Sequence, residues 1–130
     1  MRNYIKTAAG FVLSASMATV SFGATVNVGE LQGFTGPLES MIGPMSGGAN
    51  LAVTEANASG RYLYGTIVVV QGDSVCIDPA VAIAQAEKMI NDDNVMAIMG
   101  PNCSGNTGAV ISNVLVPNGV VAISPSATSP

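Results

Sequence analysis

The sequence predicts an α/β fold built around a parallel sheet. Apolar runs of strand length alternate along the chain with segments in which apolar residues recur at helical spacing. Each strand-helix-strand unit takes about thirty residues, as crossover connections between parallel strands require. The run from Thr66 to Val70 is β-branched without alternation, which is typical of a parallel strand covered on both faces. With 130 residues, the chain has room for one domain at most.

The first half of the chain contains two predicted strands and one predicted helix. Residues 25–31 alternate apolar and polar side chains and predict a strand, which ends at the glycine- and proline-containing segment 32–37. Residues 64–70 predict the second strand, at or near the centre of the sheet. Between the strands, apolar residues recur at spacings of three and four from 43 to 58 and predict a helix with one buried face. These residues are Met45, Ala49, Val53 and Ala56.

A second predicted helix opens at a capping signal. Asp78 is a favoured N-cap residue, and Pro79 fits the first helical position, where its missing N–H is not needed. The helix is expected to continue from 80 to 91 with one apolar side that packs on the sheet. That side consists of Ala82, Ile83, Ala86, Met89 and Ile90.

In the last third of the chain, predicted strands and helices alternate again, and each polar loop follows a predicted strand. The predicted elements are a strand at 95–99, a loop at 100–105, a helix at 106–113, a strand at 119–123 and a loop at 124–130. Because the carboxyl ends of parallel strands lie at one edge of a sheet, these loops and those at 32–37 and 72–78 are expected to lie together. The sequence therefore predicts that a ligand binds at this edge.

Residues 1–23 have the three-part pattern of a secretory signal peptide. Two basic residues give a positive start, residues 8–20 form an apolar stretch, and residues 21–23 offer a small-x-small cleavage site. The apolar stretch is shorter than the ~20 residues of a membrane-spanning helix, and it contains serine and threonine. We therefore predict export to the periplasm, with residues 24–130 belonging to the mature protein.

The two cysteines, Cys76 and Cys103, lie in the part that is predicted to be exported. An even number of cysteines in an oxidising compartment indicates a disulfide, and two independent buried thiols are the alternative. A disulfide would join the loop after the second strand to the loop after the third.

Composition and charge exclude several functions. Charged residues make up 9% of the chain and its net charge is −4, so nucleic acid is not an expected partner. The chain has no histidine, which rules out a Ser-His or Cys-His pair and leaves no ligand cluster for a metal within these residues. The glycine spacing at 100–107 is that of a phosphate-binding loop, but Asn106 stands where the lysine should be. We expect neither an enzyme nor a cofactor.

Two polar segments at the predicted ligand edge remain. Ser104 lies at the start of a predicted helix, where its hydroxyl and the free backbone N–H groups are able to bind a carboxylate. The alternative is that Ser104 only caps its own helix. The hydroxyls and carbonyls of residues 124–130 are able to accept an ammonium group, and the alternative is a plain linker. The residues alone leave both pairs of alternatives open.

Several motifs occur together and in order along the chain. A cysteine is followed closely by Asp-Pro, a second cysteine is followed by serine, and the last residues read Ser-Ala-Thr-Ser-Pro. The stretches that carry them are residues 28–33, 35–37, 76–91, 100–107 and 119–130. Over essentially all of the part predicted to be exported, the chain resembles the leucine/isoleucine/valine-binding proteins of ABC importers, which are type I periplasmic binding proteins. The resemblance implies that the two cysteines pair.

The resemblance also implies a set of ligand contacts. Ser104 would bind the ligand α-carboxylate through its hydroxyl and its backbone N–H. Thr128 would assist the carboxylate by its N–H and the ammonium group by its hydroxyl, and the carbonyl of Ser126 would accept from the ammonium group. Asn102 would line the same pocket, and Met41, in the first loop, would close over the ligand side chain.

The implied fold is a parallel-sheet α/β lobe, one of two lobes that are joined by a hinge and close over an amino acid. Residues 24–130 are then expected to be the N-terminal part of lobe 1, truncated before the second lobe. The implied function is the periplasmic substrate-binding component of an ABC transporter that imports branched-chain or related amino acids, with a permease of the inner membrane as its partner. A periplasmic sensor for amides, urea or another small polar solute is the alternative, and an exported enzyme whose base lies outside these residues is a third.

Overall fold

The computed structural model describes residues 23–62 and 65–129. Within them, the chain forms one parallel four-stranded sheet in the order β2-β1-β3-β4, so the predicted α/β class with a parallel sheet is confirmed. The elements are β1 (Ala24–Gln32), α1 (Glu39–Ala58), β2 (Gly65–Asp73), α2 (Pro79–Asn91), β3 (Val95–Met99), α3 (Ser104–Val110), the π-helical η1 (Ile111–Leu115), α4 (Val116–Asn118) and β4 (Val121–Ile123). Except for Gly23, the predicted signal peptide lies outside the described residues.

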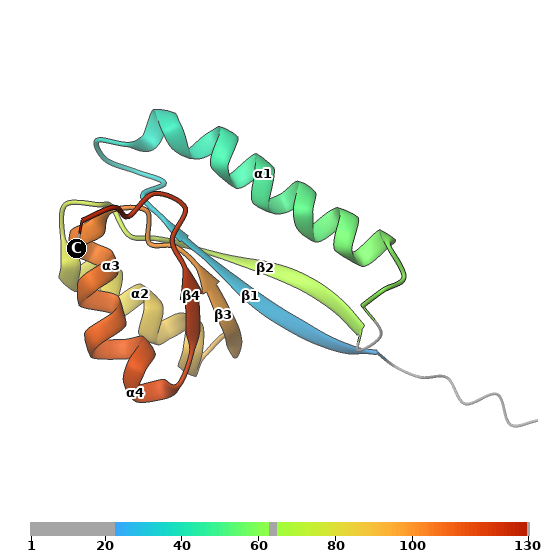
Figure 1. Ribbon diagram of the computed structural model, residues 1–130. Helices are drawn as coiled ribbons and strands as arrows, with labels where there is room; N and C mark the ends of the chain where they lie inside the picture. Colours follow the sequence, from blue (N-terminus) through green and yellow to red (C-terminus); the bar gives the residue numbers. More distant parts are fainter. Residues whose placement is uncertain (1–22, 63–64, 130) are drawn as a thin grey trace, which may run out of the picture.

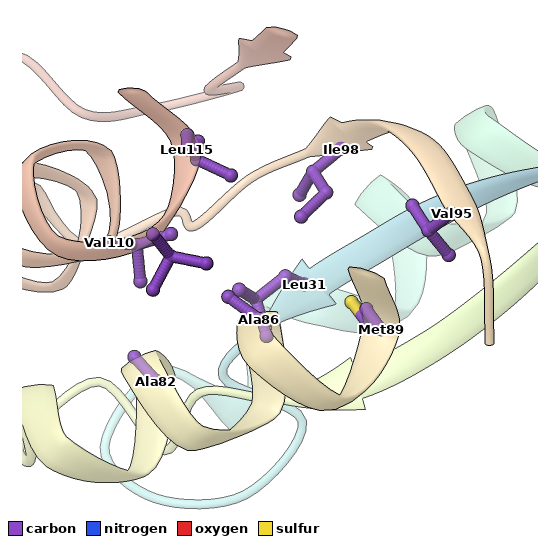
Figure 2. Packing of buried hydrophobic residues seen from close by; sticks show 9 residues of the cluster. Leu31, Ala82, Ala86, Met89, Val95, Ile98, Val110 and Leu115 are labelled. Carbon is purple, nitrogen blue, oxygen red and sulfur yellow. The ribbon is translucent and has the colours of Figure 1, made fainter. Parts of the chain in front are cut away.

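Helices lie on both sides of the sheet. Figure 1 shows α1 on one side and α2, α3 and α4 on the other. The apolar core lies on the second side, between the sheet and α2, α3 and η1, and Figure 2 shows how its side chains meet. Its members are Leu31, Ala82, Ala86, Met89, Val95, Ile98, Val110, Val114 and Leu115. The predicted apolar side of α2 is therefore confirmed, since its remaining members Ile83 and Ile90 pack against this core half-buried.

Local sequence signals fix the start of α2. Asp78 is the N-cap, and its Oδ1 accepts a hydrogen bond of 2.9 Å from the Ala80 N–H. Pro79 occupies the first helical position, as predicted. After the next strand, Gly100 adopts a φ of 116°, where a side chain would be strained and its Cβ would collide with the carbonyl oxygen of Leu31. This turn brings the chain from β3 into the loop before α3.

Helix α1 is longer and less buried than predicted. It begins at Glu39 instead of residue 43 and contains Pro44. The predicted apolar face is only half-buried, and Ile42 is the one fully buried residue of this helix. Polar groups fill the interface with the sheet instead. The Glu30 carboxylate, only 1% exposed, accepts hydrogen bonds from Gln32, Ser46 and Gln71.

Strand β2 lies at an edge of the sheet, so its predicted place at or near the centre is wrong. The central strand is β1, which pairs with both β2 and β3. Helices contact both faces of β2, α1 on one and α2 on the other. The cover is incomplete, because Thr66 and Val68 of the β-branched run are exposed. The run therefore reflects contact with helices on two sides and not a central position in the sheet. The open edge is partly closed by Asn57, whose carboxamide bonds both the N–H and the carbonyl of Ile67, each at 2.9 Å.

One face of β3 and β4 is open. Helix α1 packs on β1 and β2, and the β4 side chains that point away from the core, Val121 and Ile123, are 63% and 73% exposed. They border a shallow apolar hollow of about 240 Å³. Helix α3 runs on through η1 and α4, so it reaches residue 118 and is longer than the predicted helix at 106–113. None of the helices that the structure describes is long and apolar enough to cross a membrane.

Candidate ligand-binding site

The carboxyl ends of the strands bring four loops together, as predicted for the ligand edge. Asn102, in the loop after β3, accepts a hydrogen bond through its Oδ1 from the N–H of Gly33, in the loop after β1, at 3.0 Å. Ser124, in the loop after β4, donates to the carbonyl of Pro101 at 2.6 Å. The Cys76–Cys103 disulfide joins the loops after β2 and β3. The loop after β3 is therefore the centre of the arrangement.

Ser104 is the first residue of α3, and Cys103 is the N-cap. The alternative that Ser104 caps its own helix is therefore wrong. Its Oγ accepts hydrogen bonds from the backbone N–H groups of Thr128 at 3.1 Å and Ser129 at 3.2 Å. Because the oxygen accepts in both bonds, the hydroxyl proton is still able to donate to a ligand. The first N–H groups of a helix have no acceptor within it, so donors are concentrated at this turn.

Thr128 and Ser126 lie in the loop that follows β4, and both are exposed. The structure brings Thr128 to Ser104, and the Thr128 N–H that was expected to assist a carboxylate bonds the Ser104 oxygen here. The hydroxyl of Ser126 donates to the carbonyl of Asn102 at 2.7 Å. The loop therefore folds back onto the start of α3, which a plain linker would not do.

Asn102 is only 4% exposed, and its side-chain oxygen is bonded to Gly33 as described above. This contact fastens two loops to each other. Met41 lies in the first turn of α1 and is 57% exposed, so its predicted place in the first loop is wrong. The helix begins earlier than its glycine- and proline-rich start suggested, and Met41 falls inside it. Neither residue lines the cavity beside Ser104.

That cavity has a volume of about 470 Å³ and opens between α3 and the loop after β4. Its lining residues are Ser104, Gly105, Thr107, Gly108, Ile111, Ala127 and Ser129. A Cβ added at Gly105 or Gly108 would meet no atom within 4 Å, so these glycines leave open space along the helix. The cavity thus combines hydroxyl groups at one end with the apolar Ile111 farther along the helix.

The disulfide between Cys76 and Cys103 confirms the predicted pairing, with the two Cα atoms 5.5 Å apart. Cys76 lies in a tight turn, because both Val75 and Cys76 have positive φ angles, 48° and 67°. The first loop packs closely on this turn. A Cβ at Gly36, whose φ is 96°, would come within 2.7 Å of the Val75 carbonyl oxygen.

Asp73 holds this turn from the end of β2. Its carboxylate accepts hydrogen bonds from the Thr35 hydroxyl at 2.6 Å and from the Val75 N–H at 2.9 Å. Burial alone would raise the pKa of Asp73, but these bonds and further ones from backbone N–H groups outweigh it and hold the pKa below its ordinary value. The ionised carboxylate therefore ties the first loop to the turn that carries Cys76.

Asp73→Asn is expected to lower the free energy of unfolding by about 1 kcal/mol at pH 7, because the amide is a weaker acceptor than the carboxylate. With a folded pKa below the unfolded one, this stabilisation is present above about pH 4 and is lost as the pH falls through the folded pKa. Urea unfolding at pH 7 and at pH 3 measures the difference, which should shrink at pH 3. Glu87→Gln, at an exposed position of α2, is the control. An equal difference at both pH values would contradict this role of the carboxylate.

Asn106 is a buried polar residue. In the sequence it stands out only because it occupies the position of the lysine of a phosphate-binding loop. It is 1% exposed, and its Nδ2 donates to the carbonyl of Ser74 at 2.8 Å. No local sequence pattern predicts a contact between residues that are 32 positions apart.

Among residues 23–62 and 65–129, no group of three or more His, Cys, Asp or Glu side chains lies close enough to hold a metal ion.

A family model described as "Periplasmic binding protein" matches residues 25–130. The chain belongs to this family. The match covers every element that positions Ser104, Thr128 and the disulfide. It confirms the resemblance inferred from the cysteine and Ser-Ala-Thr-Ser-Pro motifs.

Curated relatives of this periplasmic binding protein include Leu/Ile/Val-binding proteins. The Leu/Ile/Val/Thr-binding protein of Salmonella typhimurium is 29% identical over 125 residues, which are 96% of this chain and 33% of the relative. The Leu/Ile/Val-binding protein homolog 7 of Brucella abortus is 34% identical over 103 residues, 75% of this chain and 25% of the relative. The chain spans about a third of the length of the curated relatives that it matches.

Solved structures of periplasmic binding proteins have the same lobe. The branched-chain amino acid transporter substrate-binding protein LivJ from Streptococcus pneumoniae, in complex with isoleucine, has a TM-score of 0.74 and 34% identity, and the match covers 82% of this chain and 30% of LivJ. A solute-binding protein from R. palustris in complex with benzoate has a TM-score of 0.69 and 22% identity, covering 80% and 28%. At that identity the likeness shows the fold alone. The type I periplasmic binding protein lobe that was predicted is therefore confirmed.

Proposed function

We propose that this chain forms one side of the ligand site of a periplasmic substrate-binding protein that delivers branched-chain or related amino acids to an ABC permease. The observation that carries the proposal is the first turn of α3, where the Ser104 hydroxyl lies beside the backbone of Thr128 and Ser129. A ligand carboxylate would receive the Ser104 hydroxyl proton and the free N–H groups of the helix start.

The ammonium group of an amino acid needs acceptors close to the same turn. The loop after β4 carries the Thr128 hydroxyl and the Ser126 carbonyl as the proposed acceptors, and the Thr128 backbone N–H lies 3.1 Å from the Ser104 Oγ. The apolar side chain would be held by groups other than these, with Met41 closing over it, while Asn102 would line the same pocket. Homology to Leu/Ile/Val-binding proteins supports an aliphatic side chain.

Binding without catalysis is the role that the site chemistry favours. The chain has no histidine, and both of its cysteines are in the disulfide. Among residues 23–62 and 65–129, the partners of the Ser104 hydroxyl are the two backbone N–H groups, and neither is a base. Export to the periplasm agrees with the disulfide, because such bonds persist in oxidising compartments.

A thermal-shift panel on the mature protein, expressed from its complete gene, tests the proposal. The panel contains leucine, isoleucine, valine, benzoate, acetamide and urea. Leucine or one of its aliphatic relatives at 100 times its Kd is expected to stabilise the protein by about 2.7 kcal/mol, which raises Tm by several degrees.

The other ligands separate the rival functions. Stabilisation by acetamide or urea alone would replace amino-acid transport with the sensor function. Stabilisation by benzoate alone would keep the carboxylate contact and remove the amino-acid specificity, since isoleucine and benzoate share only the carboxylate. Leucinamide is the matched control, because it keeps the side chain and ammonium group of leucine and lacks the carboxylate.

A further inference from the structure

We infer that Asn106 is a positioning residue for the Ser104 hydroxyl. The inference rests on the proposed function, since it concerns the turn that would bind the ligand carboxylate. Asn106 lies two residues after Ser104, in the first turn of α3, and its side chain is buried. It does not line the cavity, so it would act on a ligand only through Ser104.

The contact of Asn106 runs to the loop that also holds the disulfide. Its Nδ2 donates to the carbonyl of Ser74 at 2.8 Å, and Ser74 in turn donates its N–H to the carbonyl of Gln32 at 2.7 Å. Ser74 directly follows Asp73, the residue that anchors the turn at Val75. Asn106 is therefore bonded to a part of the chain that is itself fixed to the end of the central strand.

Two links thus join the same two segments, one on each side of Ser104. The disulfide holds Cys103, the residue before Ser104, and the carboxamide bond holds Asn106, two residues after it. Val110, at the other end of α3, packs in the apolar core, so these two links fix the direction of the first turn relative to the loop after β2. The Ser104 oxygen must keep its direction to stay within hydrogen-bond range of Thr128 and Ser129.

The hydrogen bond to the Ser74 carbonyl needs a donor at position 106, and the side-chain amide of Asn106 supplies it. A buried amide loses free energy unless its donors are bonded, and here the donor meets a backbone carbonyl. Alanine at 106 would remove this donor, and the Ser74 carbonyl would keep the bond that it accepts from the Cys76 N–H at 2.6 Å. The Ser74 side chain is a natural control, because the bond to Asn106 uses the backbone carbonyl of Ser74, and the buried Ser74 hydroxyl has no hydrogen-bond partner among the described residues.

Hydrogen exchange on the ligand-free mature protein, expressed from its complete gene, tests the inference. Asn106→Ala is expected to speed exchange of the Thr128 and Ser129 amide hydrogens by about 10-fold, because their acceptor at Ser104 is displaced, while the amides of α2 keep their rates. Leucine affinity, measured by calorimetry well below Tm, should fall by about 3- to 10-fold. Ser74→Ala should change neither quantity.

Each outcome decides one claim. Unchanged exchange at Thr128 and Ser129 would overturn the inference, and so would faster exchange with unchanged leucine affinity. If the unmodified protein binds no amino acid, the proposed function fails, while the exchange rates still decide whether Asn106 positions Ser104. Asn106→Ser is the second variant if the alanine variant does not fold. Serine keeps a polar side chain at this position but lacks the Nδ2 group that donates to the Ser74 carbonyl.

Discussion

Ser104→Ala is expected to weaken leucine binding to the mature protein by about 10- to 100-fold. The variant removes the hydroxyl proton that would donate to the ligand carboxylate, and hydrogen bonds to charged groups contribute about 1.5–3 kcal/mol. It also removes the oxygen that accepts from Thr128 and Ser129, so the loop after β4 loses these two hydrogen bonds to α3. Calorimetric titration with leucine measures the change in affinity.

Ser112→Ala is the matched control for this variant. Ser112 is an exposed serine in η1 and is not among the residues that line the cavity. Its replacement is expected to leave affinity unchanged. Leucinamide separates the two roles of Ser104, because it lacks the carboxylate: Ser104→Ala should reduce its binding much less than that of leucine. Leucine binding within 2-fold of the unmodified protein would contradict the carboxylate role of Ser104.

Replacing both cysteines by serine is expected to lower the free energy of unfolding by about 3.5 kcal/mol. Cys76 and Cys103 are 27 positions apart, and a cross-link that closes a loop of this length restricts the unfolded chain by roughly that amount in the chain-entropy description. The folded chain also loses the link between the turn at Val75 and the start of α3. Urea unfolding of the double variant and of the oxidised, unmodified protein measures the difference.

Reduction of the unmodified protein provides the control for the cysteine variant. The reduced protein and the Cys76→Ser/Cys103→Ser variant should unfold at similar urea concentrations, because both lack the cross-link. A loss of less than 1 kcal/mol would contradict this prediction and would mean that the hydrogen bond from Asn106 to Ser74 holds the turn after β2 to the start of α3 without the disulfide. That result would also predict that reduction leaves leucine affinity unchanged.

The parts of the fold that were predicted correctly have local signals. Asp78 and Pro79 predict the start of α2, because an N-cap side chain and a proline without an N–H both affect only the first turn of the helix. The start of α1 was missed because proline is common in the first turn of a helix, so Gly43 and Pro44 suggested a start there, whereas the helix begins at Glu39 and buries Ile42. The edge position of β2 has no local signal at all, since strand order depends on partners far along the chain.

In the candidate site, too, contacts between distant residues were harder to predict than features with a local signal. The cysteine count indicated a disulfide, and the family resemblance implied both this pairing and that Ser104 and Thr128 serve one ligand; the structure shows the disulfide and places the Thr128 N–H at Ser104. Asn102 and Asn106 make contacts over 69 and 32 positions, and no periodic pattern points to such partners. The hydrogen-bond partners of a buried side-chain amide are known only once the fold shows which carbonyls and N–H groups lie next to it.

The central place of β1 also has a consequence for the order in which the chain folds. The first strand that the structure describes is central in the sheet and gains its two neighbours at different times as the chain is made, because β2 begins at Gly65 and β3 ends at Met99. Until β3 pairs with it, one backbone edge of β1 is open to strands of other molecules. Pairings of such high contact order form slowly. A chain that is still being made therefore exposes this edge until residue 99 is available for pairing.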